Sequence, residues 1–175
     1  MNTSQVYPIE EDTLLLLKAA LSECRPGERV IEFGCGSGHI AYHLSQIADV
    51  LATDINPETV EAAHDNAIAA GVAQYITFAT CDFAATRLPP APGVIFLNPE
   101  YGERLGNETD LEPLYSRIGD FFKQKCAGYT GCVLTGNMEM SRKIGLRSIK
   151  RIPFFNGPIE CRMVVFNLYE GSEKE

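Results

Sequence analysis

The chain has 175 residues, enough to bury a substantial core, and one domain over 1–175 is the expected organisation. With 45% hydrophobic and 22% charged residues, its composition is that of an ordinary soluble globular protein. No apolar run approaches the length of a membrane span, and the N-terminus lacks a basic region followed by an apolar one. The sequence therefore predicts a cytoplasmic protein with no membrane partner.

The charges are distributed unevenly along the chain, whose net charge is −8. Residues 1–120 contain 18 acidic and 6 basic residues, whereas residues 121–175 contain 5 acidic and 9 basic residues. A surface that binds nucleic acid is usually basic, so such a surface is expected in the last third. The 6 cysteines form no C-x-x-C pair, which favours reduced thiols in the core and predicts no zinc or other metal site.

The first elements lead into a glycine-rich turn. An apolar helical pattern covers residues 14–21, an apolar strand pattern covers 29–33, and a second helical pattern covers 39–47. Three glycines at alternate positions stand between this strand and the second helix: Gly34, Gly36 and Gly38. Strand, glycine turn and helix together open a βαβ unit. Because glycine permits positive φ and exposes bare backbone to a ligand, the turn is predicted to bind a cofactor.

The glycine spacing and two acidic residues indicate which cofactor binds. Dinucleotide-binding folds prefer G-x-G-x-x-G, whereas the third glycine here comes one residue early. Glu32 stands two positions before the first glycine, and Asp54 ends the next apolar run, over 50–54. Together these residues resemble the S-adenosylmethionine-dependent methyltransferases of the Rossmann-like type, which implies S-adenosylmethionine as the cofactor. The alternative is a structural glycine turn beside two solvated acids.

The resemblance implies a role for each acid. Asp54 holds the ribose hydroxyls, which a charged acceptor about twenty residues beyond the turn can reach. Glu32 lies near the methionine ammonium, where a carboxylate is favourable. Residues 7–13 precede the first predicted helix, and a similar stretch folds over the methionine end of the cofactor in many methyltransferases. This resemblance gives Thr13 a cofactor role; the alternative is that Thr13 only caps the helix.

The next elements complete the expected cofactor site. A helix is predicted over 58–70 and a short strand over 76–80. This strand delivers Asp82 to the edge where the adenine amino group is expected, and Phe83 to the adenine ring; a loop-capping role is the alternative for Asp82. The predicted cofactor-binding residues are Thr13, Glu32, Gly34, Cys35, Gly36, Gly38, Asp54, Ile55, Asp82, Phe83 and Asn98.

An apolar strand over 93–97 ends in the tetrapeptide Asn98-Pro99-Glu100-Tyr101. It resembles the N-P-P-Y or D-P-P-Y signature of amino-group methyltransferases. In that resemblance, the Asn98 side-chain oxygen and the Pro99 carbonyl each accept one N–H of the target nitrogen, which directs its lone pair at the methyl group. Tyr101 stacks on the planar substrate group. Asn98, Pro99 and Tyr101 are thus the predicted catalytic residues.

Glu100 departs from that signature, because proline is usual at the third position. Either its side chain turns to solvent with the other three residues in place, or it loosens the site and weakens activity. Arg104, just beyond the tetrapeptide, either contacts a phosphate or base of the substrate or pairs with Glu100 or Glu103. Glu100 and Arg104 are the candidate substrate-binding residues.

Further motifs between residues 94 and 169 are typical of one family. They are N-P-E-Y-G-E-R-L-G at 98–106, L-T-G-N at 134–137 and F-N-G-P-I-E-C-R at 155–162. They resemble the catalytic domain of bacterial THUMP-containing ribosomal RNA guanine-N2 methyltransferases, which implies guanine N2 of large-subunit ribosomal RNA as the target. No RNA-binding THUMP module fits in the first 29 residues, so a protein partner that recognises the substrate is also considered. Residues 7–66 instead resemble the branch that methylates glutamine or archaeal RNA.

The C-terminal elements indicate the architecture. Residues 131–135 are predicted as a strand and 138–145 as a short helix, and the extended runs 148–155 and 160–169 meet at Asn156-Gly157, a hairpin signal. The basic residues of this region form a candidate RNA-binding patch: Arg142, Lys143, Arg147, Lys150 and Arg151.

The predicted fold is α/β: a Rossmann-like class I methyltransferase with a seven-stranded, mostly parallel sheet and a C-terminal antiparallel hairpin. Within the single domain, residues 1–28 form an N-terminal helix and cofactor lid, 29–170 form the core, and 171–175 form a tail. The predicted function is S-adenosylmethionine-dependent N-methylation of RNA at a guanine amino group. Methylation of a protein glutamine is the alternative, and an inactive cofactor-binding partner subunit is a third hypothesis.

Overall fold

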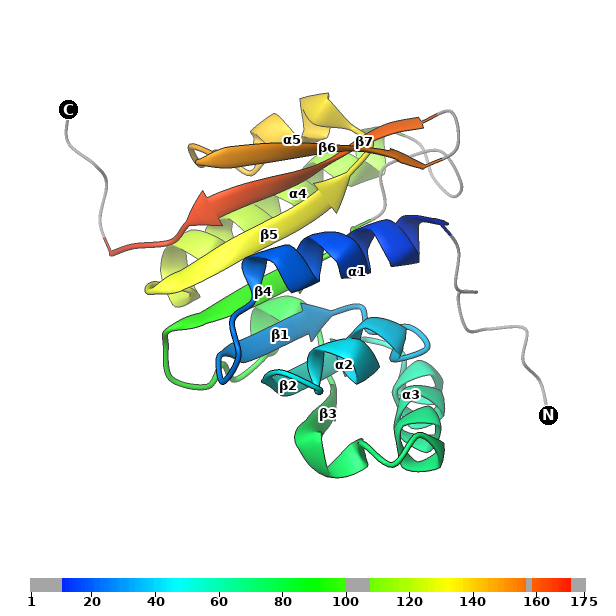
Figure 1. Ribbon diagram of the computed structural model, residues 1–175. Coiled ribbons are helices and arrows are strands. Elements are labelled where there is room, and N and C mark those ends of the chain that lie inside the picture. Colours follow the sequence, from blue (N-terminus) through cyan, green and yellow to red (C-terminus); the bar gives the residue numbers. More distant parts are fainter. Residues whose placement is uncertain (1–10, 100–107, 157–158, 171–175) are drawn as a thin grey trace.

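A computed structural model describes residues 11–99, 108–156 and 159–170 (Figure 1). The helices and strands are, in chain order, α1 (Glu11–Glu23), β1 (Arg29–Phe33), α2 (His39–Leu44), β2 (Asp49–Asp54), α3 (Pro57–Ala69), β3 (Ile76–Thr80), β4 (Gly93–Leu97), α4 (Glu108–Lys125), β5 (Tyr129–Thr135), α5 (Met138–Lys143), β6 (Lys150–Asn156) and β7 (Ile159–Asn167). Two short 3₁₀ turns, Ala73–Tyr75 and Phe83–Ala85, flank β3.

All of these strands belong to one sheet. The strand order is β3-β2-β1-β4-β5-β7-β6, with seven strands in total. The first five are parallel, whereas β7 runs antiparallel to both β5 and β6. The order reverses beside β1, so that β1 and β4 are the neighbours at which a ligand crevice is expected. The seven-stranded, mostly parallel sheet with a terminal antiparallel hairpin is confirmed.

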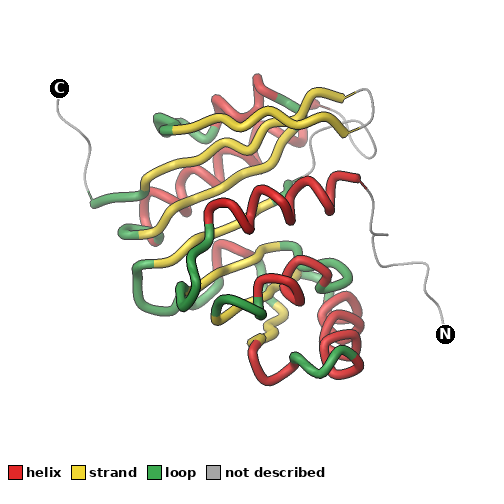
Figure 2. Tube along the Cα trace, viewed as in Figure 1, coloured by secondary structure: helices red, strands yellow, loops and turns green. Residues whose placement is uncertain are grey.

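Helices cover both faces of the sheet (Figures 1 and 2). One hydrophobic cluster joins α1, α2 and α3 to the sheet. The other, called the α4 cluster below, joins α4 and α5 to the opposite face. In β1, for example, Val30 belongs to the first cluster and Ile31 to the second. Because both faces are covered, the central strands consist of nearly continuous apolar residues.

The long helix α4 was not predicted as an element. Its polar first turns and the internal Pro113 hide a clear helical spacing of buried side chains. Those side chains are Leu111, Tyr115, Ile118 and Phe122, all 3% exposed or less. Their intervals of four, three and four residues are the signal that could have revealed the helix. Two predicted helices are also shorter than expected, since α2 ends at Leu44 and α5 at Lys143.

Gly119 of α4 lies directly against α5. A Cβ atom at this position would stand 2.0 Å from the carbonyl oxygen of Ile144, which follows α5. We expect Gly119→Ala to destabilise the fold by about 2 kcal/mol, because forced overpacking exceeds the roughly 1 kcal/mol that alanine adds in helix propensity. The melting temperature should fall by about 4–8 °C, as measured by differential scanning calorimetry. Asp120→Ala, at the exposed next position, is the control and should not lower it; an unchanged melting temperature for Gly119→Ala would contradict this packing.

Candidate functional site

The glycine turn leaves the sheet at the carboxyl end of β1. Gly34 and Gly36 have φ angles of 75° and 52°, a left-handed backbone that other residues rarely adopt. The backbone N–H groups of Gly34 and Cys35 donate to the Thr53 carbonyl at 2.8 and 2.9 Å, which ties the turn to β2. A Cβ on Gly34 or Gly36 would meet no atom within 4 Å, so the backbone there faces open space. Cys35 itself is buried, and its contribution to a ligand site is limited to the backbone.

Asp54 ends β2 beside this turn. One carboxylate oxygen accepts a hydrogen bond from the Asn56 N–H at 3.0 Å, and the other accepts one from the Gly36 N–H at 3.4 Å. Each oxygen retains further acceptor capacity. Ile55, the next residue, leaves 71% of its surface exposed. The turn, a half-buried carboxylate and an exposed apolar side chain are therefore adjacent.

Glu32 is a buried acid near the carboxyl end of β1, an inner strand of the sheet. It is 3% exposed, and its Oε2 atom has no hydrogen-bond partner among the residues that the structure describes. Burial raises the pKa of Glu32 to about 8; a hydrogen bond from the Ala41 backbone partly offsets this effect, and the charge of Asp54 adds to it. A buried carboxyl oxygen without a partner is unfavourable unless a ligand supplies one.

Asp82 and Phe83 follow β3, as predicted, but their contacts include a residue that sequence reasoning missed. The Arg117 guanidinium of α4 donates to both Asp82 carboxylate oxygens at 2.8 and 2.9 Å, and its Cζ lies 5.0 Å from the centre of the Phe83 ring. Asp82 also caps the 3₁₀ turn by accepting from the Ala84 N–H at 2.9 Å. Burial alone would raise the pKa of Asp82, but Arg117 and the Ala84 N–H lower it below its usual range. The capping alternative thus describes one of the contacts of Asp82.

Phe83 packs edge-on against two other rings, Phe33 of β1 and Phe121 of α4. Its ring is partly buried against the α4 side of the core, so its orientation is fixed before any ligand binds. No spacing in the sequence links Asp82 or Phe83 to Arg117, since 35 residues separate Asp82 from Arg117.

Asn98 and Pro99 leave the sheet at the carboxyl end of β4. The register of the parallel pair places Leu97 beside Phe33, so Asn98 follows β4 where Gly34 follows β1. Adjacent strands are about 4.8 Å apart, which makes the two segments direct neighbours. Asn98 is exposed and Pro99 is partly buried. Tyr101, Glu100 and Arg104 lie outside the described residues, so their predicted roles stay predictions.

Thr13 lies in the first turn of α1, a helix that begins on the side of the sheet where the parallel strands end (Figure 1). The residues predicted to precede it as a lid lie outside the described part of the chain. The structure thus brings the glycine turn, Glu32, Asp54 and Asn98 together where the parallel strands end. Asp82 follows β3 at the same end of the strands.

The candidate RNA-binding patch divides between two faces of the sheet. Lys150 forms an ion pair with Glu23 of α1, on the side that α1 covers. Arg151, the next residue, points to the opposite side, since its cross-strand partner Val164 belongs to the α4 cluster. Lys143 pairs with Glu112 at 2.9 Å. These five residues therefore do not form one continuous surface.

The described residues contain no group of three or more His, Cys, Asp or Glu side chains that could hold a metal ion. None of the described helices is both long and apolar enough to cross a membrane. Five of the six cysteines are buried, and Cys81 is half-buried.

Comparisons with known proteins point to one family. A family model described as "RMKL-like, methyltransferase domain" matches residues 16–165. The "Ribosomal RNA large subunit methyltransferase K/L" of Shewanella frigidimarina is 36% identical over 122 residues, which are 70% of this chain and 17% of that protein. The corresponding protein of Syntrophotalea carbinolica is 32% identical over 131 residues, 73% of this chain and 18% of that protein. The chain thus spans less than a fifth of the length of these relatives.

Solved structures share the fold. SMU.472, crystallised with SAH, superposes with a TM-score of 0.80 at 19% identity, covering 94% of this chain and 54% of that one. TrmK of M. capricolum, in complex with S-adenosyl-homocysteine (SAH), superposes with a TM-score of 0.67 at 10% identity, covering 91% and 70% of the two chains. At these identities the likeness extends to the fold alone.

Proposed function

The chain belongs to the family of RMKL-like methyltransferase domains, and from this premise we propose that it transfers a methyl group from S-adenosylmethionine to an amino nitrogen of RNA. The observation that carries the proposal is the pairing of β1 with β4, which sets the glycine turn beside Asn98. A cofactor that lies on the turn then has its reactive end next to a side chain that can hold a planar amino group. The family resemblance of residues 94–169 names guanine N2 of ribosomal RNA as the target, and the names of the curated relatives support ribosomal RNA.

The residues around the turn fit the cofactor. Glu32 offers a buried, unpartnered carboxyl oxygen to the methionine ammonium, and Asp54 offers two oxygens with spare capacity to the ribose hydroxyls. Ile55 covers the adenine with its exposed side chain, and Asp82 accepts from the adenine amino group while Arg117 keeps it ionised. Gly34, Cys35, Gly36 and Gly38 contribute backbone, and Thr13 closes the methionine end.

The chain's own residues position the substrate rather than activate it. Bound S-adenosylmethionine supplies a methyl group on a positively charged sulfur, which is already a good leaving group. The Asn98 side-chain oxygen and the Pro99 carbonyl accept the two N–H groups of the target nitrogen and hold its lone pair in line with that methyl group. Tyr101, Glu100 and Arg104 are proposed to contact the substrate from the loop that follows. A protein partner is proposed to contribute to the choice of nucleotide.

The function is tested by transfer of a labelled methyl group. Purified protein is incubated with labelled S-adenosylmethionine and either RNA or a glutamine-containing protein fraction, and the nucleosides are then separated and identified by mass spectrometry. We expect label in N2-methylguanosine from RNA. Label in protein alone would favour the glutamine alternative. If neither acceptor is labelled although SAH binds, the chain is a cofactor-binding partner subunit and the proposal is wrong.

Asp54 provides a direct test of the cofactor site. We expect Asp54→Ala to weaken SAH binding by about 100-fold, because two hydrogen bonds to a charged acceptor are lost and each contributes about 1.5 kcal/mol or more. Isothermal titration calorimetry measures the change. The matched control is Asp49→Ala, an exposed acid at the amino end of the same strand, which should bind SAH as the unaltered protein does. Equal affinity in the two variants would contradict the assignment of Asp54.

A further inference from the structure

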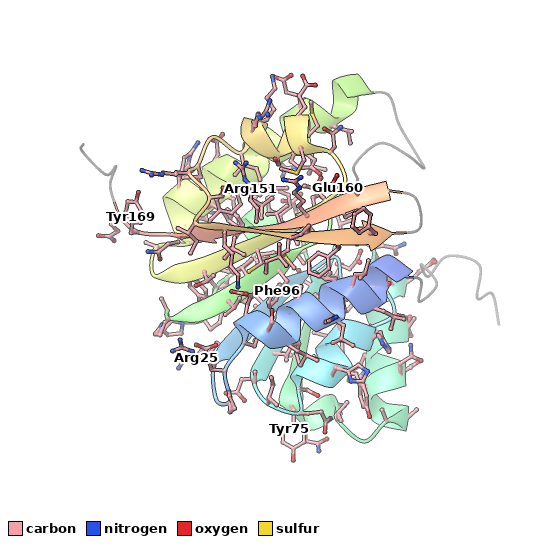
Figure 3. All side chains as sticks on the ribbon, turned by 45° about the horizontal axis from the view of Figure 1, so that its top comes forward. Arg25, Tyr75, Phe96, Arg151, Glu160 and Tyr169 are labelled. Atoms are coloured by element: carbon pink, nitrogen blue, oxygen red, sulfur yellow. The ribbon has the colours of Figure 1, made fainter. Side chains whose placement is uncertain are left out.

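In the β6–β7 hairpin, every second side chain of each strand points to the side of the sheet that carries α4 and α5. On that side, Phe155 stands across from Glu160, and Pro153 stands across from Arg162. Arg151 comes next, beside Val164. We call the first four of these residues together with Arg151 the hairpin face; Figure 3 labels two of its members, Arg151 and Glu160.

The helices leave the hairpin face uncovered. Val164 is 2% exposed because it packs in the α4 cluster, whereas the Phe155 side of the hairpin extends beyond that cluster. Phe155 is 66% exposed, and the Arg162 side chain is 37% exposed. An aromatic ring this exposed at the end of a strand has no role in the packing of the core.

The hairpin face lies on the same edge of the sheet as the candidate site. Arg162 pairs with Thr135, the last residue of β5, and β5 is the neighbour of β4. Arg162 therefore lies two strand spacings, about 10 Å, from the line of β4, and Asn98 directly follows that strand. In Figure 1, β6 ends and β7 begins on the side toward which β1 and β5 point. A strand of RNA with one nucleotide at Asn98 reaches the hairpin face within a few nucleotides.

The chemistry of this surface suits single-stranded nucleic acid. The Arg162 guanidinium is oriented by Glu160, which accepts from its Nε and from a terminal nitrogen at 3.2 and 2.6 Å. The Arg151 Nε donates to the Ser148 hydroxyl at 3.0 Å. Each guanidinium has five N–H donors, so both retain donors for phosphate oxygens. Aromatic rings on which bases stack, next to guanidinium groups, are the combination that binds single strands.

An extended peptide is a poorer partner for the hairpin than RNA is. β6 is the outermost strand of the sheet, and an outermost strand with unpaired backbone groups can pair with an extended peptide. Pro153, in the middle of β6, lacks a backbone N–H, which interrupts the row of donors that such a peptide would need. The two arginines outnumber the single acid, which favours a negatively charged partner.

We propose that the hairpin face binds the single-stranded RNA that flanks the methylated nucleotide, with Phe155 stacked on a base and Arg151 and Arg162 bound to phosphates. This inference rests on the proposed function, because it extends the substrate path from Asn98 along the edge of the sheet. Stacking on Phe155 is tolerant of sequence, so the hairpin face supplies affinity and register rather than choice of nucleotide.

The test is fluorescence anisotropy with a fluorescein-labelled single-stranded RNA of about ten nucleotides and the full chain with SAH bound. We expect Phe155→Ala to weaken binding about tenfold at every salt concentration, because stacking is not ionic. Arg151→Ala should reduce the slope of log affinity against log salt by about 0.7, since one phosphate contact is lost. The matched controls are Tyr75→Ala and Arg25→Ala, an exposed aromatic and an exposed cation at remote positions (Figure 3), and neither should change binding.

The outcomes separate the two proposals. If the unaltered chain methylates RNA and both hairpin variants bind the labelled RNA as it does, the hairpin face is not the RNA path, although the proposed function stands. If the unaltered chain binds SAH but neither binds nor methylates RNA, the RNA substrate and the hairpin inference both fail. A change in oligomeric state for Phe155→Ala with unchanged RNA affinity would assign the face to a second copy and overturn the proposal. Melting curves check that Phe155→Ala is folded, and the salt slope of Arg151→Ala is a readout that a loss of stability does not mimic.

Discussion

Replacement of Asn98 by alanine is expected to lower the rate of methyl transfer by about 100- to 1,000-fold. The side-chain oxygen of Asn98 is one of two acceptors proposed to fix the target nitrogen, and loss of one positioned polar contact at a reacting centre has an effect of about that size. Asn98 is exposed at the end of β4, so the change should leave the melting temperature within about 1 °C. Single-turnover kinetics with saturating S-adenosylmethionine measure the chemical step.

Asn98→Asp is the matched variant for this experiment. It keeps an oxygen acceptor at the same position, and aspartate occupies this position in part of the amino-group methyltransferases that the tetrapeptide resembles. We expect it to retain at least about tenfold more activity than Asn98→Ala, with SAH affinity within about threefold of the unaltered chain for both. Equal rates for alanine, aspartate and asparagine would remove Asn98 from the catalytic role.

The parts of the fold that follow from short-range patterns were predictable. The strand at 29–33 and the glycine turn could be located because a buried parallel strand is an apolar run and because only glycine accepts the backbone angles that follow it. The terminal hairpin was also predicted, since two extended runs meet at Asn156-Gly157. Each of these signals is local in the sequence and does not depend on contacts between distant segments.

What the sequence did not reveal depends on contacts between distant segments. The Arg117 side chain of α4 pairs with Asp82 only because the sheet places α4 beside the turn after β3. Lys150 and Arg151 point to opposite faces because side chains alternate along a strand, but which face each one takes depends on the register with β7. Residues 100–107, which contain Tyr101 and Arg104, lie outside the described chain, so the structure locates the cofactor side of the candidate site more fully than the substrate side.

The burial of Glu32 depends both on a short-range pattern and on contacts between distant segments. Its position in β1 was evident from the sequence, but the burial that leaves its Oε2 atom without a partner among the described residues arises from the helices that cover that face. Val30, two residues earlier on the same face, is an ordinary core residue. The acid on this apolar face therefore serves the candidate site and not the stability of the fold, since an apolar residue would pack there more favourably.

The second large effect is expected in the pH dependence of stability. Burial raises the pKa of Glu32 from 4.5 to about 8, so the folded chain keeps a proton that the unfolded chain releases. Between these two values the unfolded state binds fewer protons, and the free energy of unfolding therefore decreases as the pH rises. The decrease is complete above pH 8 and amounts to about 5 kcal/mol at most. Ionised Glu32 is then a buried charge whose Oε2 has no partner among the described residues.

Glu32→Gln isolates this contribution, because an amide resembles the protonated acid and does not titrate. We expect the melting temperature of the unaltered chain to fall by about 10 °C more than that of the variant between pH 5 and pH 8. Groups such as His39 titrate in both proteins and cancel in the comparison. The proposed pairing of Glu32 with the methionine ammonium adds a second expectation: SAH should stabilise the unaltered chain more at pH 8 than the variant, since only the carboxylate gains a charged partner. Parallel melting curves for the two proteins over this pH range would contradict the buried, protonated state of Glu32, and equal stabilisation by SAH would contradict its place beside the ammonium.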